Sequence, residues 1–381
     1  MLETNLLKTE GKTSEGGRPL SVASLWLDGF RNYAYETVGL ASGFNVLAGR
    51  NAQGKTNFLE GLYLLSTTRL LRGQRDSEAI LDGRQRAEVT AELAGSETRL
   101  SIVLEAGIRK RGSINGLSVP RASDLIGRLP CVCVSAQDMD LVRGEPAGRR
   151  LFLDLELSAL SAAYLRHLTM YKRALEQRNA LLRDSREWMQ PKEVFEPWEE
   201  QLATHGAAIR QARNEFVQRL SPPAVEIHGQ MGGGEHIELR IEAKDPAVDP
   251  EALLEGLTAT RSLDIARGGT GLGPHRDDLR IDVGDREAKL YGSQGQQRTA
   301  VISLKLATLQ VSLTQFGVPP LLLLDDILSD LDESRRALLV EVVIERAGQA
   351  VLTCTEAAAA GSRILERAKV FHVEAGRVKQ A

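Results

Sequence analysis

One short stretch constrains this chain more than any other, because its spelling, G-x-x-x-x-G-K-T, is that of a phosphate-binding loop. An apolar segment at 44–47 is expected to form a strand before it, and residues 57–65 a helix after it. Glycines let the backbone wrap around phosphates, and free N–H groups at a helix N-terminus attract them. A chance match in a glycine-rich turn would not bring this strand and helix in the right order. The loop consists of Gly49, Arg50, Asn51, Ala52, Gln53, Gly54, Lys55 and Thr56.

Two side chains of this loop have predicted chemical roles. Lys55 is expected to reach the terminal phosphates of a nucleoside triphosphate, and Thr56 to present its hydroxyl to Mg²⁺. The stretch therefore predicts a nucleoside triphosphate site.

A second constraint is the run PPLLLLDD at 319–326. It predicts a buried parallel strand, and in open α/β sheets ligands lie at the carboxyl ends of strands. Asp325 is expected to hold the metal ion. Asp326 would point to the other side and is the candidate for polarising the attacking water. The plain alternative is that two acids end a strand in a solvated turn.

A third stretch, residues 291–299, precedes an apolar-faced helix. It places a small hydroxyl residue and a glycine at a helix N-terminus, which is a second potential anion site. Taken alone, it also fits an ordinary N-cap. Its candidate nucleotide contacts are Ser293, Gln294, Gly295 and Gln296.

These motifs together resemble the RecF family of ABC/SMC-like ATPases. The stretch at 291–299 looks like the ABC-class signature, and Ser329-Asp330-Leu331-Asp332 resembles the D-loop that follows it. The similarity extends from Ser24 to the end of the chain. Other stretches that carry it are Phe30-Arg31-Asn32-Tyr33, residues 69–78, Asp140-Leu141-Val142, Arg149-Arg150-Leu151-Phe152-Leu153-Asp154 and Gly273-Pro274-His275-Arg276-Asp277-Asp278.

The resemblance implies an ATP-dependent homodimer in which Ser293 and its neighbours of one subunit close over ATP held by Lys55 of the other. Asp332 would join this interface, and Gln137 matches the Q-loop position, where an amide senses nucleotide. Transporters usually place Glu where this chain has Asp326, and their late switch His has no counterpart in residues 353–356. Slow hydrolysis is therefore expected.

The biological role is also implied by the resemblance. It is that of a DNA-binding clamp of recombinational gap repair, with a weak, DNA-stimulated ATPase that releases the dimer from junctions of single-stranded and duplex DNA. RecR and RecO would be partners in helping RecA displace single-strand-binding protein. Roles in replication restart and the SOS response, and a cytoplasmic, nucleoid-associated location, belong to the same expectation.

The fold class implied is α/β: a discontinuous ABC-type P-loop ATPase head with an antiparallel β subdomain and an inserted short helical arm. With 381 residues, 42% of them apolar, the chain can form two lobes. The expected ranges are a flexible extension over 1–20, the head over 21–135 and 265–381, and the arm or lid over 136–264.

Two stripes at helical spacing predict the arm, with a break that holds Pro191 and Pro197. A helix of about 30 residues is roughly 45 Å long, which is too short for a coiled-coil rod. The first stripe is Leu160, Tyr164, Leu168, Tyr171, Leu175 and Leu182, and the second is Trp198, Leu202, Ile209, Phe216 and Leu220.

The formal net charge of -3 means that DNA must be met by a local basic surface. Two clusters are candidates for sequence-independent phosphate contacts. The alternative is that they are solvated and paired with acids such as Asp76 and Glu78. With 4% aromatic residues, duplex backbone is favoured over stacking on single-stranded bases. The candidates are Arg69, Arg72 and Arg75, and Arg109, Lys110 and Arg111.

Cys131, Cys133 and Cys354 form neither a disulfide framework nor a zinc spacing, and Cys131 and Cys133 read as two residues of one strand. This fits a reducing cytosol. No apolar run is long enough to span a bilayer, and the N-terminus lacks the build of a signal peptide.

Three rival interpretations remain. In a transporter subunit the signature follows the P-loop much sooner than the 238 residues (293 minus 55) that separate Ser293 from Lys55 here. An SMC structural protein would need long sustained heptads. A module that binds ATP without hydrolysing it would use the nucleotide only to join two subunits.

Overall fold

The computed structural model describes residues 21–72, 75–232, 234–245 and 247–381. The extension expected over 1–20 lies outside the described residues. The described chain forms two compact units: one holds 140–225 and 236–297, and the other holds residues up to 139 together with 226–235 and 298–381. We call the first the helical unit and the second the nucleotide unit. Residues 265–297, expected in the head, group with the helical unit, and residues 136–139 and 226–235, expected in the arm, group with the nucleotide unit. The expected domain limits stay a prediction.

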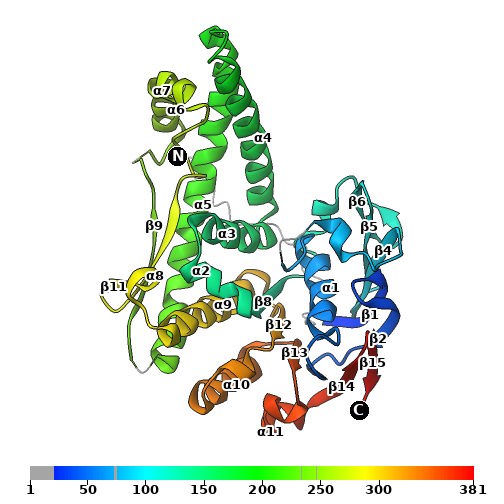
Figure 1. Cartoon of the computed structure of the whole chain (residues 1–381). Coiled ribbons are helices and arrows are strands. Elements are labelled where there is room, and N and C mark those ends of the chain that lie inside the picture. The colour runs from blue at the N-terminus through cyan, green and yellow to red at the C-terminus, as the bar shows by residue number, and fades with distance from the viewer. Residues whose placement is uncertain (1–20, 73–74, 233, 246) are drawn as a thin grey trace. The chain divides into compact units, whose positions relative to one another are not determined.

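The nucleotide unit contains a mixed sheet in the order β15-β14-β3-β13-β12-β8 (Figure 1). Neighbouring strands from β14 to β8 are parallel, and only β15 pairs antiparallel. The strands are β3 (Phe44–Ala48), β8 (Cys131–Ser135), β12 (Leu321–Asp325), β13 (Ala350–Cys354), β14 (Ala368–Glu374) and β15 (Arg377–Gln380).

The register of this sheet brings its carboxyl ends into line. Asp325 of β12 pairs with Thr353 of β13 and with Ser135 of β8, and Thr353 pairs in turn with Leu47 of β3. β12 is buried along its four leucines, as the apolar run predicts. The P-loop and the two acids therefore meet at one edge.

A second, antiparallel sheet of the same unit has the order β2-β1-β4-β5-β6-β7. Helix α1 (Lys55–Thr67) packs against strands of both sheets, and Phe58, Leu59 and Leu62 are fully buried in the shared core. Asn115 and Gly116, both at positive φ, form the turn between β6 and β7. The strands are β1 (Ser21–Phe30), β2 (Tyr33–Gly39), β4 (Arg86–Ala94), β5 (Arg99–Glu105), β6 (Ile108–Ile114) and β7 (Leu117–Ser118).

Short helices and two longer ones complete this unit. None of the helices among the described residues is long and apolar enough to cross a membrane. The elements are the 3-10 turns at Asp76–Ala79, Ala122–Leu125, Ala136–Met139, Leu328–Asp330 and Ala357–Ala360, with α10 (Glu333–Arg346), α11 (Ser362–Leu365) and the larger part of α9 (Gln294–Phe316).

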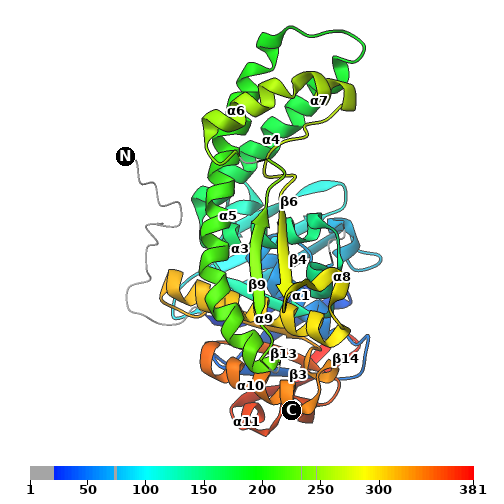
Figure 2. The ribbon, with the colours of Figure 1, turned by 90° about the vertical axis from the view of Figure 1, so that its left-hand side faces the viewer.

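The helical unit is built on two antiparallel helices, α4 (Ala162–Asp184) and α5 (Glu196–Met231), seen side by side in Figures 1 and 2. Their contacts run in opposite directions, since Arg178 meets Glu199 whereas Tyr164 meets Arg213. At 36 residues, α5 is about 54 Å long. The remaining elements are α2 (Asp140–Arg143), α3 (Pro146–Leu160), a 3-10 turn (Lys192–Val194), β9 (Ile237–Glu242), α6 (Pro250–Ala259), α7 (Arg261–Arg267), β10 (Asp278–Val283), β11 (Arg286–Glu287), α8 (Ala288–Tyr291) and the start of α9.

Two details of the predicted arm were wrong. Leu160 ends α3 and does not share a helix with Tyr164, because Ser161 accepts a hydrogen bond from the Tyr164 amide and caps a new helix. Pro197 lies in the first turn of α5 rather than in a break, at a position where a missing N–H costs no intrahelical bond.

A buried ionic network links the helices of this unit. Arg178 is fully buried and contacts Glu199 and Asp264, each about 1% exposed, at 3.0 and 2.8 Å. Arg261 reaches the other oxygen of Glu199. Removing one partner of such a network leaves a buried charge uncompensated.

We therefore expect Arg178→Met to lower the stability of the helical unit by about 3 to 5 kcal/mol. Hydrogen exchange followed by mass spectrometry in α4 and α5 measures the loss. Arg363→Met is the control, because Arg363 pairs with Glu341 on an exposed surface and should cost less than about 1 kcal/mol. Equal protection of α4 and α5 in both variants would contradict the stabilising role of the network.

Candidate nucleotide site

The P-loop has the backbone conformation that its glycines permit. Gly54 has φ 119°, and a Cβ there would lie 2.7 Å from the side chain of Asn32. A Cβ on Gly49 would lie 2.3 Å from the carbonyl oxygen of Val373. Ala52 is also left-handed at φ 64°. The loop therefore follows a path that side chains at 49 and 54 would block.

Neighbouring segments hold the loop through its carbonyl oxygens. Asn32 Nδ2 donates to Gln53 O at 2.9 Å, and the Tyr33 hydroxyl donates to Gly54 O at 2.9 Å. The amide of Gly376, in the turn between β14 and β15, donates to Gln53 O at 3.0 Å. Burial raises the pKa of Tyr33, which keeps its hydroxyl a donor. Because the carbonyl oxygens of Gln53 and Gly54 accept hydrogen bonds from neighbouring segments, the amides of the loop can face a ligand.

Lys55 is buried, and its Nζ donates to the carbonyl oxygens of Gly49 and Arg50 at 2.5 and 2.9 Å. The ammonium group thus lies across the loop from which it comes. It is placed where terminal phosphates would be expected to replace these carbonyls.

The carboxylate of Asp325 joins the P-loop to the sheet. Thr56 Oγ1 donates to Asp325 Oδ1 at 2.9 Å, and Thr353 Oγ1 donates to the same oxygen at 2.8 Å. Burial raises the pKa of Asp325; the two hydroxyl donors and the charge of Arg72 oppose the shift, and Asp326 adds to it. A nearby cation would stabilise this buried anion.

Asp326 has a left-handed backbone, with φ 53°. Its amide donates to Thr353 Oγ1 at 2.9 Å, and Ser329 Oγ donates to its Oδ1 at 3.0 Å. Thr353 therefore contacts both acids. It stands in the segment that lacks a switch histidine, and its role was missed because only the pairing of β13 with β12 brings it to the site.

Two other residues expected around the nucleotide, Gln137 and Asp332, make no contact with the P-loop or the two acids that the structure records. Gln137 is exposed in the turn that follows β8, the strand beside β12. Asp332 caps α10, because its side chain accepts a hydrogen bond from the amide of Arg335 at 3.0 Å. This hydrogen bond and a second one from the Ser334 hydroxyl lower the pKa of Asp332. Its observed contacts are those of a helix cap.

The signature stretch belongs to the helical unit as far as Gln297, and α9 begins within it at Gln294. The Ser293 amide donates to Gln296 Oε1 at 2.7 Å, and the Gln296 amide donates to Ser293 Oγ at 3.3 Å, which is a capping box. The ordinary N-cap function is therefore present. Ser293 and Gln294 remain exposed at this helix N-terminus.

Some residues of the two basic clusters form ion pairs with acids, whereas others do not. Lys110 Nζ contacts Thr68 O and Asp76 at 2.8 Å, and Arg111 pairs with Glu105, so the alternative of paired surface charges holds for both. The exposed side chains of Arg69, Arg75 and Arg109 make no ion pair with any residue that the structure describes. Arg72 acts on Asp325 through its charge, which places it near the nucleotide site rather than in a purely surface cluster.

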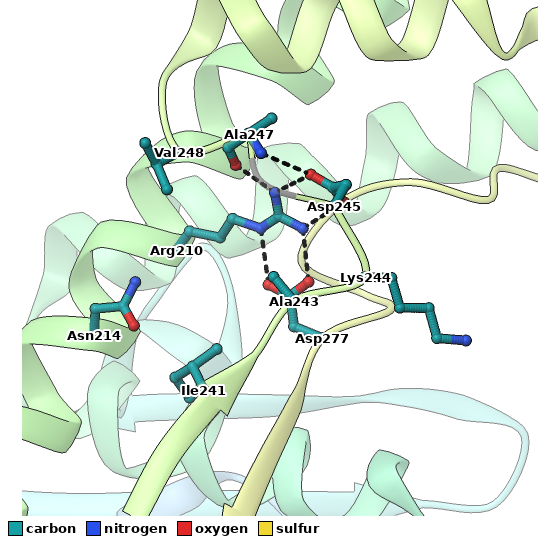
Figure 3. A pocket seen from close by; sticks show the side chains of 9 residues that line it. All are labelled: Arg210, Asn214, Ile241, Ala243, Lys244, Asp245, Ala247, Val248 and Asp277. Carbon is teal, nitrogen blue, oxygen red and sulfur yellow. Dashed lines mark hydrogen bonds and ion pairs between the residues drawn. The ribbon is translucent and has the colours of Figure 1, made fainter.

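A cavity of about 410 Å³ in the helical unit, lined by Arg210, Asp245 and Asp277 among others, is shown in Figure 3. Arg210 lies between the two carboxylates at 2.5 to 2.8 Å, so their charges are already matched.

Cys131 and Cys133 lie in β8 as expected, and burial raises the pKa of Cys133.

Comparison with known proteins decides the family. The model described as the RecF/RecN/SMC N-terminal domain matches residues 21–378. The DNA replication and repair protein RecF of Symbiobacterium thermophilum is 40% identical over 346 residues, which cover 88% of this chain and 91% of that protein. The chain belongs to the RecF family. RecF of Shouchella clausii is 36% identical over 372 residues, covering 94% and 99% of the two chains.

Solved structures agree with this assignment. The recombination mediator protein RecF-ATP of the RecFOR pathway has a TM-score of 0.87 and 28% identity, covering 95% of this chain and 98% of that one. The Smc head of Pyrococcus furiosus, at 16% identity and a TM-score of 0.54, shares the fold. The expected ABC-type ATPase head and the role in DNA replication and repair are thus confirmed, and the transporter interpretation is set aside.

The residues at this edge fit a nucleotide with its metal ion. A threonine hydroxyl and a buried carboxylate are hard oxygen ligands of the kind Mg²⁺ prefers. Lys55 supplies a cation beside the loop, and the carbonyls of Gln53 and Gly54 are occupied from outside.

We expect Asp325→Asn to leave the fold at least as stable without ligand while abolishing Mg²⁺-dependent hydrolysis. Asn keeps an oxygen that can accept the hydroxyls of Thr56 and Thr353. Because the folded-state pKa is raised, folding favours protonated Asp325, and its contribution falls as the pH rises above the ordinary value of 3.8. The advantage of Asn should therefore grow from acid toward neutral pH.

Thermal melting of both proteins across this pH range measures the effect, with Asp332→Asn as the control. Asp332 is exposed and its pKa is lowered, so this change should reduce stability at neutral pH. A wild-type advantage over Asp325→Asn that grows toward neutral pH would show that Asp325 is not a destabilised buried anion.

Proposed function

We propose that the chain is an ATP-dependent DNA clamp, in which ATP with Mg²⁺ binds the P-loop and joins two subunits on DNA. The observation that carries this proposal is the hydrogen bond of 2.9 Å between Thr56 and Asp325. It brings the two residues that would share a metal ion together from opposite ends of the sequence. The solved structure of RecF-ATP, which covers 95% of this chain, supports ATP as the nucleotide.

The roles of the individual residues follow from their positions. Lys55 and the loop from Gly49 to Thr56 bind the phosphates, and Thr56 and Asp325 hold Mg²⁺, which neutralises charge on the phosphate oxygens. Asp326 orients and polarises the attacking water, and Gln137 is a candidate for the same network. Ser329 and Thr353 fix the position of Asp326.

Dimerisation would complete the site from a second copy. Ser293, Gln294, Gly295 and Gln296 of one subunit lie at an exposed helix N-terminus, which can face the terminal phosphate of ATP on its partner, and Asp332 would join this interface. DNA at gaps and junctions would be bound through exposed arginines such as Arg69, Arg75 and Arg109. RecR and RecO would act with the clamp to help load RecA, in the cytoplasm at the nucleoid, and in replication restart and the SOS response.

Light scattering with ATP and a gapped duplex tests this assembly. The wild type should change from monomer to dimer, more completely with DNA, whereas Lys55→Met should stay monomeric because the cation beside the phosphates is lost. Lys379→Met, on the exposed strand β15, is the matched control and should dimerise. Wild-type mass that never changes with ATP would rule out the clamp and favour a one-site ATPase.

Hydrolysis is tested separately with Asp326→Asn. If hydrolysis releases the dimer, this variant should bind ATP, dimerise and persist at least about tenfold longer after dilution, as expected when a catalytic base loses its charge. Glu333→Gln, an exposed change near the same segment, is the control. An unchanged dimer lifetime would favour a module in which ATP only joins the subunits.

A further inference from the structure

The turn at 270–278 in the helical unit gathers several arginine side chains on its carbonyl oxygens. Arg276 donates from Nε and Nη2 to Thr270 O at 3.1 and 2.9 Å. Arg150, on α3, donates from Nη1 to Asp277 O at 2.8 Å, and Arg213, on α5, donates to Pro274 O at 2.7 Å. The turn thus positions guanidinium groups from three different segments.

Most positive charges at this turn are matched by carboxylates. Three arginines have ion pairs of 2.5 to 2.8 Å with aspartates, and these cations are buried. The pairs are Arg149 with Asp278, Arg210 with Asp245 and Asp277, and Arg213 with Asp154. Figure 3 shows Arg210 between its two partners.

Two arginines at the turn have no carboxylate partner among the described residues. Neither Arg150 nor Arg276 forms an ion pair with a carboxylate among the residues that the structure describes, although both are hydrogen-bonded to carbonyls. Arg276 is exposed and Arg150 is partly exposed. Burial and then the charge of Arg213 lower the pKa of Arg150; the charges of Asp278 and Asp154 oppose this shift, and that of Arg276 adds to it. Arg150 and Arg276 are therefore close enough to interact.

His275 ties the turn to Tyr171 on α4 and adds no charge of its own. His275 Nε2 lies 3.0 Å from Thr270 O, and its Nδ1 lies 2.6 Å from the Tyr171 hydroxyl. Burial first, and the charges of Arg276 and Arg150 after it, lower the pKa of His275 to about 4, so the ring is neutral near pH 7. A neutral ring donates to Thr270 O through Nε2 and accepts from Tyr171 through Nδ1.

We propose that Arg150 and Arg276 form a site on the helical unit that binds phosphate groups of a nucleic-acid backbone. Their guanidinium groups are held in place by carbonyl oxygens before binding, and a phosphodiester supplies the ion-pair partner that neither arginine has among the described residues. This inference rests on the proposed DNA-binding function and adds a contact outside the clusters at 69–75 and 109–111. Both arginines lie in stretches whose family resemblance was noted without a role.

A polynucleotide fits the site better than a free anion does. The formal net charge of -3 repels a polyanion in the overall field, so its binding depends on local cations. A polynucleotide can contact several local cations at once, whereas a single anion contacts only one site. No base-reading geometry is required, and the contacts are independent of sequence.

Fluorescence anisotropy with a labelled duplex, measured without ATP over about 50 to 200 mM salt, tests the site. Arg150→Gln and Arg276→Gln should each weaken binding roughly tenfold at low salt and reduce the slope of log K against log salt by about 1. Arg276→Lys keeps the charge and should keep the slope. Inorganic phosphate, added at constant ionic strength, distinguishes a small-anion site by competing at millimolar concentration.

The matched control is Arg280→Gln, because Arg280 lies on β10 of the same unit but pairs with Asp282 at 2.9 Å. Its affinity and slope should equal those of the wild type, and circular dichroism verifies that every variant is folded. Unchanged affinity and slope in both Arg150→Gln and Arg276→Gln would overturn the proposal, as would efficient competition by phosphate. Because no ATP is present, these results do not depend on dimerisation.

Discussion

The Asp325 carboxylate is the group on which the nucleotide unit depends. It lies at the end of β12, accepts hydrogen bonds from Thr56 and Thr353, and so ties the first turn of α1 to two strands of the sheet. Burial raises its pKa, so the two hydroxyl groups stabilise a charge that is unfavourable without a cation. The fold keeps this carboxylate in place because β12 is buried along its whole apolar length.

Local chemistry made this edge predictable. The P-loop, the strand before it and the helix after it are encoded by contiguous residues, because glycines at 49 and 54 permit a path that other residues cannot follow. The leucine run likewise identified β12. Thr353 was not predictable, because its role depends on the pairing of β13 with β12, which no local pattern encodes. The pairing of Lys110 with Asp76 was one of two alternatives that the sequence left open, and the contact between distant segments decides between them.

The helical unit shows the same limit. Its apolar stripes predicted two long helices, but Ser161 begins α4 and separates it from α3, a local cap signal that the periodicity alone does not contain. Arg178, Glu199 and Asp264 come from three elements and hold them together through buried charges. Arg150 and Arg276 lie near other buried ion pairs of this unit but have no carboxylate partner among the described residues. This difference is the basis for proposing that they bind phosphate groups.

The most direct test of the account is whether Mg²⁺ acts through Thr56. Binding of a fluorescent ATP analogue can be measured with Mg²⁺ and with a chelator, at protein concentrations low enough to avoid dimerisation, for the wild type and Thr56→Val. We expect Mg²⁺ to tighten binding to the wild type but to leave binding to Thr56→Val nearly unchanged, because Val keeps the shape of the side chain and removes the metal ligand. An equal effect of Mg²⁺ on both proteins would contradict a metal site shared by Thr56 and Asp325.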